Sequence, residues 1–153
     1  MDLADILTEN MIRLSLESSD KDGVLEELVD VLAAEGKLND RDAALEAVLE
    51  RESKMSTGMQ NGIAIPHGKS DSVDELVAAI AIKQDGIDFS ALDGLPSQIF
   101  IVTLSPVDRT GPHIQFLSAI SQLLNKDVAR ERLLAATSVE DIRAVMCADV
   151  ESL

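Results

Sequence analysis

His67 is the residue of this sequence best suited to covalent chemistry. It follows the apolar run Ile63–Ile65 and Pro66, and Gly68 comes directly after it. A short strand that stops at a proline would present the imidazole from a turn at a sheet edge, with Gly68 leaving room for a bulky group. A neutral imidazole is a good nucleophile near pH 7, because its ordinary pKa lies close to that value. A turn histidine that only caps a backbone carbonyl fits the same pattern, so the spacing leaves both interpretations open.

Two other residues have the chemistry to hold an anion. His113 stands at the predicted start of a helix, where its ring and the free backbone N–H groups could face negative charge. Arg51 lies between Glu50 and Glu52 near the end of an acidic helix, and its planar guanidinium could clamp a phosphoryl group. A helix-entry residue and a surface ion pair are the simpler alternatives for these two. With His67 they could form a phosphoryl-transfer site, although the pattern does not show that they meet.

Composition and charge exclude several other classes of function. The chain has 153 residues, a net charge of −15 and a hydrophobic fraction of 46%, with no Trp or Tyr. An excess of acid opposes sequence-independent binding of nucleic acid, and the usual aromatic platforms for stacking bases are missing. Two His and one Cys are too few for a zinc finger or a disulfide framework. We therefore expect no nucleic-acid partner, no metal and no cofactor.

Two catalytic motifs can be tested by spacing. Gly68-Lys69-Ser70 resembles the end of a P-loop, but that motif requires a glycine where this chain has Ile63. Pro66 would also remove a backbone donor from a phosphate cradle. The Gly-x-Ser-x-Gly turn of an α/β-hydrolase does not occur in the sequence.

Hydrophobic periodicity predicts helices and strands that alternate along the chain. Helices are expected at about 3–7, 20–36, 40–51, 111–124, 128–135 and 137–146, and extended segments at 11–16, 63–65, 76–83 and 97–104. The last two segments are typical of central strands covered on both faces. Asp85-Gly86 and Asp93-Gly94 are predicted turns. The expected fold class is α/β, a single domain over residues 1–153 with a mixed parallel and antiparallel sheet flanked by helices on both faces.

Several side chains can be assigned to the core or the surface. Cys147 and the phenylalanines Phe89, Phe100 and Phe116 are expected to be buried. An apolar group could form a soft docking patch or simply pack inside: Met55, Met59 and Ile63. The helix after Gly111 is expected to bury one stripe: Ile114, Leu117, Ile120, Ser121 and Leu124.

The N-terminus does not read as a signal peptide, and the longest apolar stretch, Leu76–Ile82, is far shorter than the roughly 18 residues that a membrane span needs. We expect a soluble, cytoplasmic protein with no direct membrane insertion.

A series of short motifs runs over nearly the whole chain. They are Arg51-Glu52-Ser53, Ser56-Thr57-Gly58, Asn61–Lys69, Gly86–Phe89, Leu92-Asp93-Gly94, and His113 with Phe116-Leu117-Ser118. With these motifs the chain resembles the enzyme IIA domain of the fructose–mannitol class of the bacterial phosphotransferase system. Within that class it is most similar to the nitrogen-related regulatory IIA proteins.

The resemblance implies a site and a donor. The phosphorylated histidine of the family falls on His67, which would accept a phosphoryl group from an HPr-type phosphocarrier protein. The second histidine of the family falls on His113 and its arginine on Arg51, and both would help to hold that group. Arg51 and Lys69 would make the rim of the site less negative than the rest of the surface. The expected binding residues around them are Thr57, Gly58, Asn61, Pro66 and Gly68.

The resemblance leaves two main functions open. One is a phosphocarrier in sugar uptake, which passes the group to a cysteine of an enzyme IIB domain. The other is a regulatory protein whose phosphorylation at His67 changes its binding to target proteins. A degenerate domain used only for interaction is a third, and the presence of Arg51, His67 and His113 counts against it.

Overall fold

Two long apolar strands form the centre of a five-stranded mixed sheet in the computed structural model, which describes residues 2–153. β4 (Val77–Ile87) and β5 (Ser97–Ser105) run antiparallel, with Ile80 opposite Ile101. The short strand β1 (Ile12–Arg13) pairs parallel with β4. On the other side, β2 (Ile63–Ala64) and β3 (His67–Lys69) both pair parallel with β5. The predicted α/β class with a mixed sheet is confirmed, while Met1 of the expected 1–153 domain lies outside the described residues.

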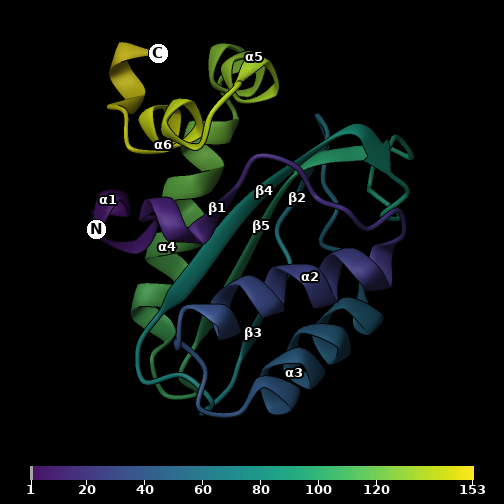
Figure 1. The fold of residues 1–153 in the computed structure, drawn as a ribbon, viewed down its shortest axis with the longest axis vertical. Coiled ribbons are helices and arrows are strands. Elements are labelled where there is room, and N and C mark those ends of the chain that lie inside the picture. The colour runs from purple at the N-terminus through teal and green to yellow at the C-terminus, as the bar shows by residue number, and fades with distance from the viewer. Residues whose placement is uncertain (1) are drawn as a thin grey trace.

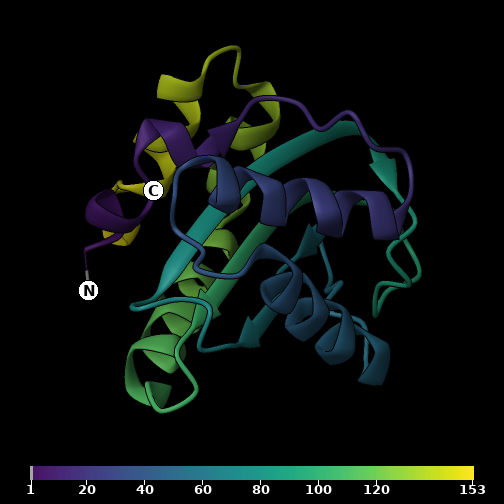
Figure 2. The ribbon, with the colours of Figure 1, turned by 60° about the horizontal axis from the view of Figure 1, so that its bottom comes forward.

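Helices cover both faces of this sheet (Figures 1 and 2). One face carries α2 (Lys21–Ala34) and α3 (Arg41–Lys54). The opposite face carries α4 (Thr110–Leu124), α5 (Asp127–Ala135) and α6 (Val139–Met146), with the short helix α1 (Leu3–Ile6) beside α6. Two short 3-10 turns lie at Glu9–Met11 and Val150–Ser152.

The central strands divide the interior into two hydrophobic cores. Successive side chains of a strand point to opposite faces, so Phe100 and Val102 pack with α2 and α3. Ile99 and Ile101, which alternate with them, pack with α4, α5 and α6. The expectation that these strands are covered on both faces is therefore confirmed. Phe89, Phe100 and Phe116 are fully buried, as predicted.

Short polar side chains cap three helices at, or within one residue of, the predicted starts at 20, 40 and 137. The Asp20 carboxylate accepts a hydrogen bond from the Gly23 N–H at the start of α2, and Asp40 does the same for Ala43 in α3. At the start of α6, the Ser138 hydroxyl accepts from the Asp141 N–H. These caps satisfy donors that the first helical turn leaves free.

Three local predictions are wrong. Asp85 and Gly86 lie within β4, at an irregularity between Ile82 and Ile87, because Gly86 has a φ of 78° that bends the strand without ending it. Cys147 is exposed: it is the C-cap residue of α6, and the helix buries Ile142, Val145 and Met146 instead. In α4, Ile114 is 59% exposed and Ser121 is also exposed. The helix instead buries another stripe: His113, Phe116, Ile120, Leu123 and Leu124.

Candidate functional site

His67 is the first residue of β3, not a turn residue, and it pairs in register with Thr103 of β5. The preceding Pro66 is buried, and its carbonyl accepts a hydrogen bond from the Thr103 N–H. Burial and this bond together fix the backbone just before His67. The ring itself is half-buried. β3 pairs along one edge only, with β5, which leaves the strand that carries His67 at the border of the sheet.

One hydrogen bond fixes the tautomer of His67. Its Nδ1 lies 2.8 Å from the Ile65 carbonyl oxygen, which can only accept. Nδ1 therefore carries the proton, and Nε2 keeps its lone pair. Burial lowers the pKa of His67, and the Arg51 charge lowers it further against the opposing effects of the Ile65 carbonyl and Glu52. The ring is thus neutral near pH 7. His67 does cap a backbone carbonyl, as the simpler interpretation of the sequence has it, and the same hydrogen bond leaves Nε2 free to act as a nucleophile.

His113 brings a second imidazole against the first. It lies in the first turn of α4, is only 6% exposed, and its ring centroid is 5.4 Å from that of His67. Its Nδ1 lies 2.9 Å from Oγ of Ser105, the last residue of β5. Burial, followed by the effects of His67 and Lys69, lowers the pKa of His113 to about 4, so this ring is also neutral near pH 7.

Arg51 comes from the opposite layer, in the last turn of α3. Its Nη1 donates a hydrogen bond to the Met55 carbonyl at 2.9 Å, which leaves the other guanidinium N–H groups for a ligand. Gly68 lets this helix approach His67. A Cβ at Gly68 would lie 3.2 Å from the backbone carbon of Ala47, so the room that the glycine leaves is taken by α3.

His67, His113 and Arg51, the three residues predicted to form the site, line one cavity of about 360 Å³. Its wall carries the cations Arg51, Lys54 and Lys69 against the single carboxylate of Glu50, so its charge is opposite to that of the chain as a whole. The Lys69 ammonium donates to the Thr110 hydroxyl at 2.7 Å. The full lining is Ala47, Glu50, Arg51, Lys54, His67, Gly68, Lys69 and His113.

Sequence reasoning missed several of these contributors. Ala47, Arg51 and Lys54 lie three or four residues apart, so their shared helix face was a signal available from spacing. Ser105 carries no such signal, because its contact with His113 depends on how α4 packs over the end of β5.

The structure does not bring Thr57 to this cavity. Its N–H and Oγ1 donate to the two carboxylate oxygens of Glu52, at 2.9 and 2.6 Å, and both residues are buried. The hydroxyl that was expected to reach the site is therefore already committed. Gly58 is also a packing residue, since a Cβ there would lie 2.9 Å from Cα of Ala91.

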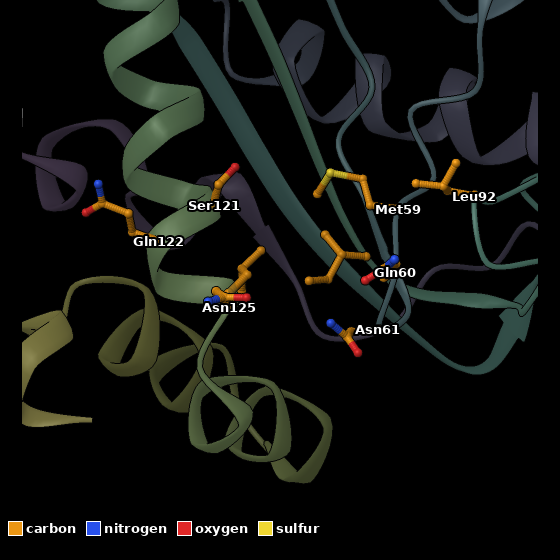
Figure 3. Close-up of a pocket in the computed structure, with 9 residues that line it drawn as sticks. Met59, Gln60, Asn61, Leu92, Ser121, Gln122 and Asn125 are labelled. Carbon is orange, nitrogen blue, oxygen red and sulfur yellow. The ribbon is translucent and has the colours of Figure 1, made fainter.

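Asn61 lines a different cavity, of about 490 Å³, between the loop before β2 and the end of α4 (Figure 3). It has a φ of 66°, and its N–H donates to the Asp93 carboxylate. Met59 and Ile63 also line this cavity, whereas Met55 is 71% exposed beside Arg51, so these three apolar residues do not form one surface. The two cavities share no lining residue.

Within residues 2–153, no group of three or more His, Cys, Asp or Glu side chains is close enough to hold a metal ion. In the same part of the chain, every helix is too short or too polar to cross a lipid bilayer.

Comparison with known proteins identifies the class of protein to which this fold belongs. Residues 5–148 match the family described as "Phosphoenolpyruvate-dependent sugar phosphotransferase system, EIIA 2". The chain belongs to this family, which confirms the resemblance to the enzyme IIA domains of the phosphotransferase system that its motifs predict.

Individual relatives carry two kinds of name. The fructose-specific EIIA component of Haloferax volcanii is 41% identical, over 99% of this chain and 100% of that one. The fructose-specific EIIABC component of Bacillus subtilis is also 41% identical over 93% of this chain, which spans only 22% of that longer protein. The crystal structure of the nitrogen regulatory protein IIA-Ntr from Neisseria meningitidis superposes with a TM-score of 0.87 at 30% identity, covering 94% of this chain and 98% of that one.

Proposed function

We propose that this protein is a histidine phosphocarrier whose His67 accepts a phosphoryl group at Nε2 from an HPr-type protein and passes it to an enzyme IIB cysteine. The observation that carries the proposal is the hydrogen bond from His67 Nδ1 to the Ile65 carbonyl, at 2.8 Å. That bond leaves Nε2 as an unprotonated nucleophile in a cavity that also contains Arg51 and His113. Membership of a phosphotransferase-system family supports the same chemistry.

Both transfer steps balance on the same ring nitrogen. In the first, the Nε2 lone pair of His67 attacks phosphorus, the donor's N–P bond breaks, and its electron pair returns to the donor imidazole. In the second, a cysteine thiolate attacks phosphorus and the electron pair of the Nε2–P bond returns to His67. The proton stays on Nδ1, hydrogen-bonded to the Ile65 carbonyl oxygen, so His67 gains and loses no proton in either step.

The cavity offsets the charge that the phosphoryl group brings to a chain at −15. Arg51, Lys54 and Lys69 line its wall, and phosphoryl transfer depends mainly on positioning and on such charge stabilisation. Arg51 presents a planar fork of donors that suits phosphoryl oxygens. Phosphoenolpyruvate is a metabolite of the cytoplasm, so we propose that this protein acts in the cytoplasm. We also propose that the whole chain forms one domain.

Sugar uptake is the first physiological setting we propose. The fructose-specific names of two relatives at 41% identity support it, and one of them joins this kind of domain to further components in a single chain. Regulation is the second. The structural match to a nitrogen regulatory protein, at 30% identity, supports a role in which phosphorylation of His67 alters the binding of target proteins.

Reconstitution tests the shared chemistry and then separates the two settings. The protein is incubated with labelled phosphoenolpyruvate, enzyme I and HPr, and we expect one acid-labile phosphohistidine at His67. The His67→Ala variant should take up no label, and persistent labelling in it would overturn the site assignment. Adding fructose-class IIB domains should then remove the label if the protein serves uptake. Efficient labelling without transfer to any of them would favour regulation.

A further inference from the structure

We propose that Ser105 is a positioning residue: its buried hydroxyl donates to His113 Nδ1 and thereby holds the His113 proton on Nε2, the nitrogen that then donates to the transferred group. This inference rests on the proposed function for its catalytic consequence. The placement of the proton itself rests only on the hydrogen bonds described below.

The contact between Ser105 and His113 is buried on both sides. Ser105 is fully buried, His113 is 6% exposed, and Oγ lies 2.9 Å from Nδ1. The backbone of Ser105 is also fixed. It pairs in register with Lys69 of β3, and its carbonyl accepts a hydrogen bond from the Ser70 N–H. The hydroxyl is therefore held in place beneath the first turn of α4.

The direction of this hydrogen bond follows from what each atom can do. Within residues 2–153, His113 Nδ1 is the one hydrogen-bond partner of the Ser105 hydroxyl. If Nδ1 carried the proton and donated it, the hydroxyl hydrogen would be buried without an acceptor, which folded proteins avoid. Ser105 therefore donates. Since the lowered pKa of His113 leaves the ring with a single proton near pH 7, that proton lies on Nε2.

The two histidines of the cavity thus hold opposite tautomers. His67 has its proton on Nδ1 and a lone pair on Nε2, while His113 has a lone pair on Nδ1 and its proton on Nε2. One ring is prepared to attack phosphorus, and the other, 5.4 Å away between centroids, is prepared to donate to a phosphoryl oxygen. The other tautomer of His113 would direct a lone pair at an anion, which is repulsive.

The same strand offers a matched control. Ser97, at the other end of β5, is also a fully buried serine, and its Oγ has no hydrogen-bond partner among residues 2–153. Replacing either serine with alanine removes one hydroxyl from the same strand at equal burial. Only the Ser105 change removes a bond to the cavity.

Two measurements on the full chain test the proposal. A two-bond ¹H–¹⁵N correlation spectrum at pH 7 reports the tautomer of His113, and a labelling assay gives the rate of phosphorylation by phospho-HPr. We expect the Nε2–H tautomer in the wild type and in Ser97→Ala. Ser105→Ala should give a mixture of tautomers and a rate about three- to tenfold lower, the effect of losing one neutral hydrogen bond. Ser105→Thr, which keeps the hydroxyl, should restore the tautomer.

Three results would overturn the proposal. The first is a wild-type His113 with its proton on Nδ1. The second is a Ser105→Ala variant with unchanged tautomer or unchanged rate. The third is an equal slowing in Ser97→Ala, which would indicate general loosening of β5. The tautomer is read without a donor protein, so a wild type that shows the expected tautomer but takes up no label would refute the proposed function and leave the placement of the proton intact.

Discussion

The Glu52 carboxylate accepts two hydrogen bonds from Thr57, one from the backbone N–H and one from the side-chain hydroxyl. The same carboxylate forms an ion pair of 2.9 Å with Lys21 of α2, although Glu52 is only 6% exposed. Arg51, the residue before it, lines the cavity of His67 and donates to Met55 in the same loop. A buried charge network therefore ties the end of α3, and with it Arg51, to the loop that follows.

Replacing Glu52 with glutamine should destabilise the fold. It removes the charge partner of Lys21, which is itself 24% exposed, and takes from Thr57 one of the two buried acceptor oxygens, a loss of about 1–3 kcal/mol in the free energy of unfolding. Urea unfolding measures this loss. Glu50→Gln is the control, because its ion pair with Lys54 is exposed and longer, at 3.8 Å. Equal unfolding midpoints for the two variants would contradict this account of Glu52.

Replacing Arg51 should slow phosphorylation without preventing it. Arg51→Ala removes the planar donors that face the cavity, and we expect a rate of labelling about a hundredfold lower. Arg51→Lys should retain part of the rate, because it keeps the charge and loses the fork. Arg41→Ala, at the other end of α3, should leave the rate unchanged, since Arg41 pairs with exposed carboxylates on the surface, away from the cavity. A rate for Arg51→Ala within a factor of two of the wild type would remove Arg51 from the site.

Acid should weaken the fold through His113. Its folded-state pKa of about 4 lies below the ordinary value of 6.5, so folding favours the neutral ring. This contribution is complete above pH 6.5 and is lost as the pH falls toward 4, because the unfolded chain then binds a proton that the folded chain does not. Between pH 7 and pH 4, the free energy of unfolding should fall roughly 3 kcal/mol further in the wild type than in His113→Gln. Parallel stability curves would show that the folded state does not depress this pKa.

A methyl group at Gly68 should separate α3 from β3. The alanine Cβ would lie 3.2 Å from the backbone of Ala47, so the helix must shift. We expect Gly68→Ala to cost about 1–3 kcal/mol of stability, measured by urea unfolding, and to slow labelling because Arg51 moves with α3. In Gly111→Ala the new methyl meets open space, so its stability should stay close to that of the wild type. A stable and fully active Gly68→Ala would show that the close approach is not required.

Local patterns predict much of the architecture. Asp20 and Asp40 signal the starts of α2 and α3, because a cap depends only on residues three positions away. The continuous apolar runs of β4 and β5 signal central strands, because burial on both faces leaves no polar alternation. The residues His67, His113 and Arg51 could be named from motifs, but their meeting in one cavity depends on packing between two layers.

Hydrophobic periodicity gives a wrong prediction where a polar residue of the site occupies a buried helix position. In α4 the apolar Ile114 fits a core stripe, yet it is exposed, because the inward position is occupied by His113. The tautomers could not be predicted for a related reason. They depend on the Ile65 carbonyl and the Ser105 hydroxyl, whose positions relative to the rings are set by the path of the folded chain.

The division of the interior into two cores has a consequence for how this fold diversifies. Arg51 is anchored through α3 to one core and His113 through α4 to the other, while α5 and α6 contribute no residue to the cavity. The outward surfaces of these last helices can therefore change sequence without disturbing the chemistry at His67. Proteins that share the cavity can in this way differ on that surface, and the relatives of this chain do carry both fructose-specific and nitrogen-regulatory names.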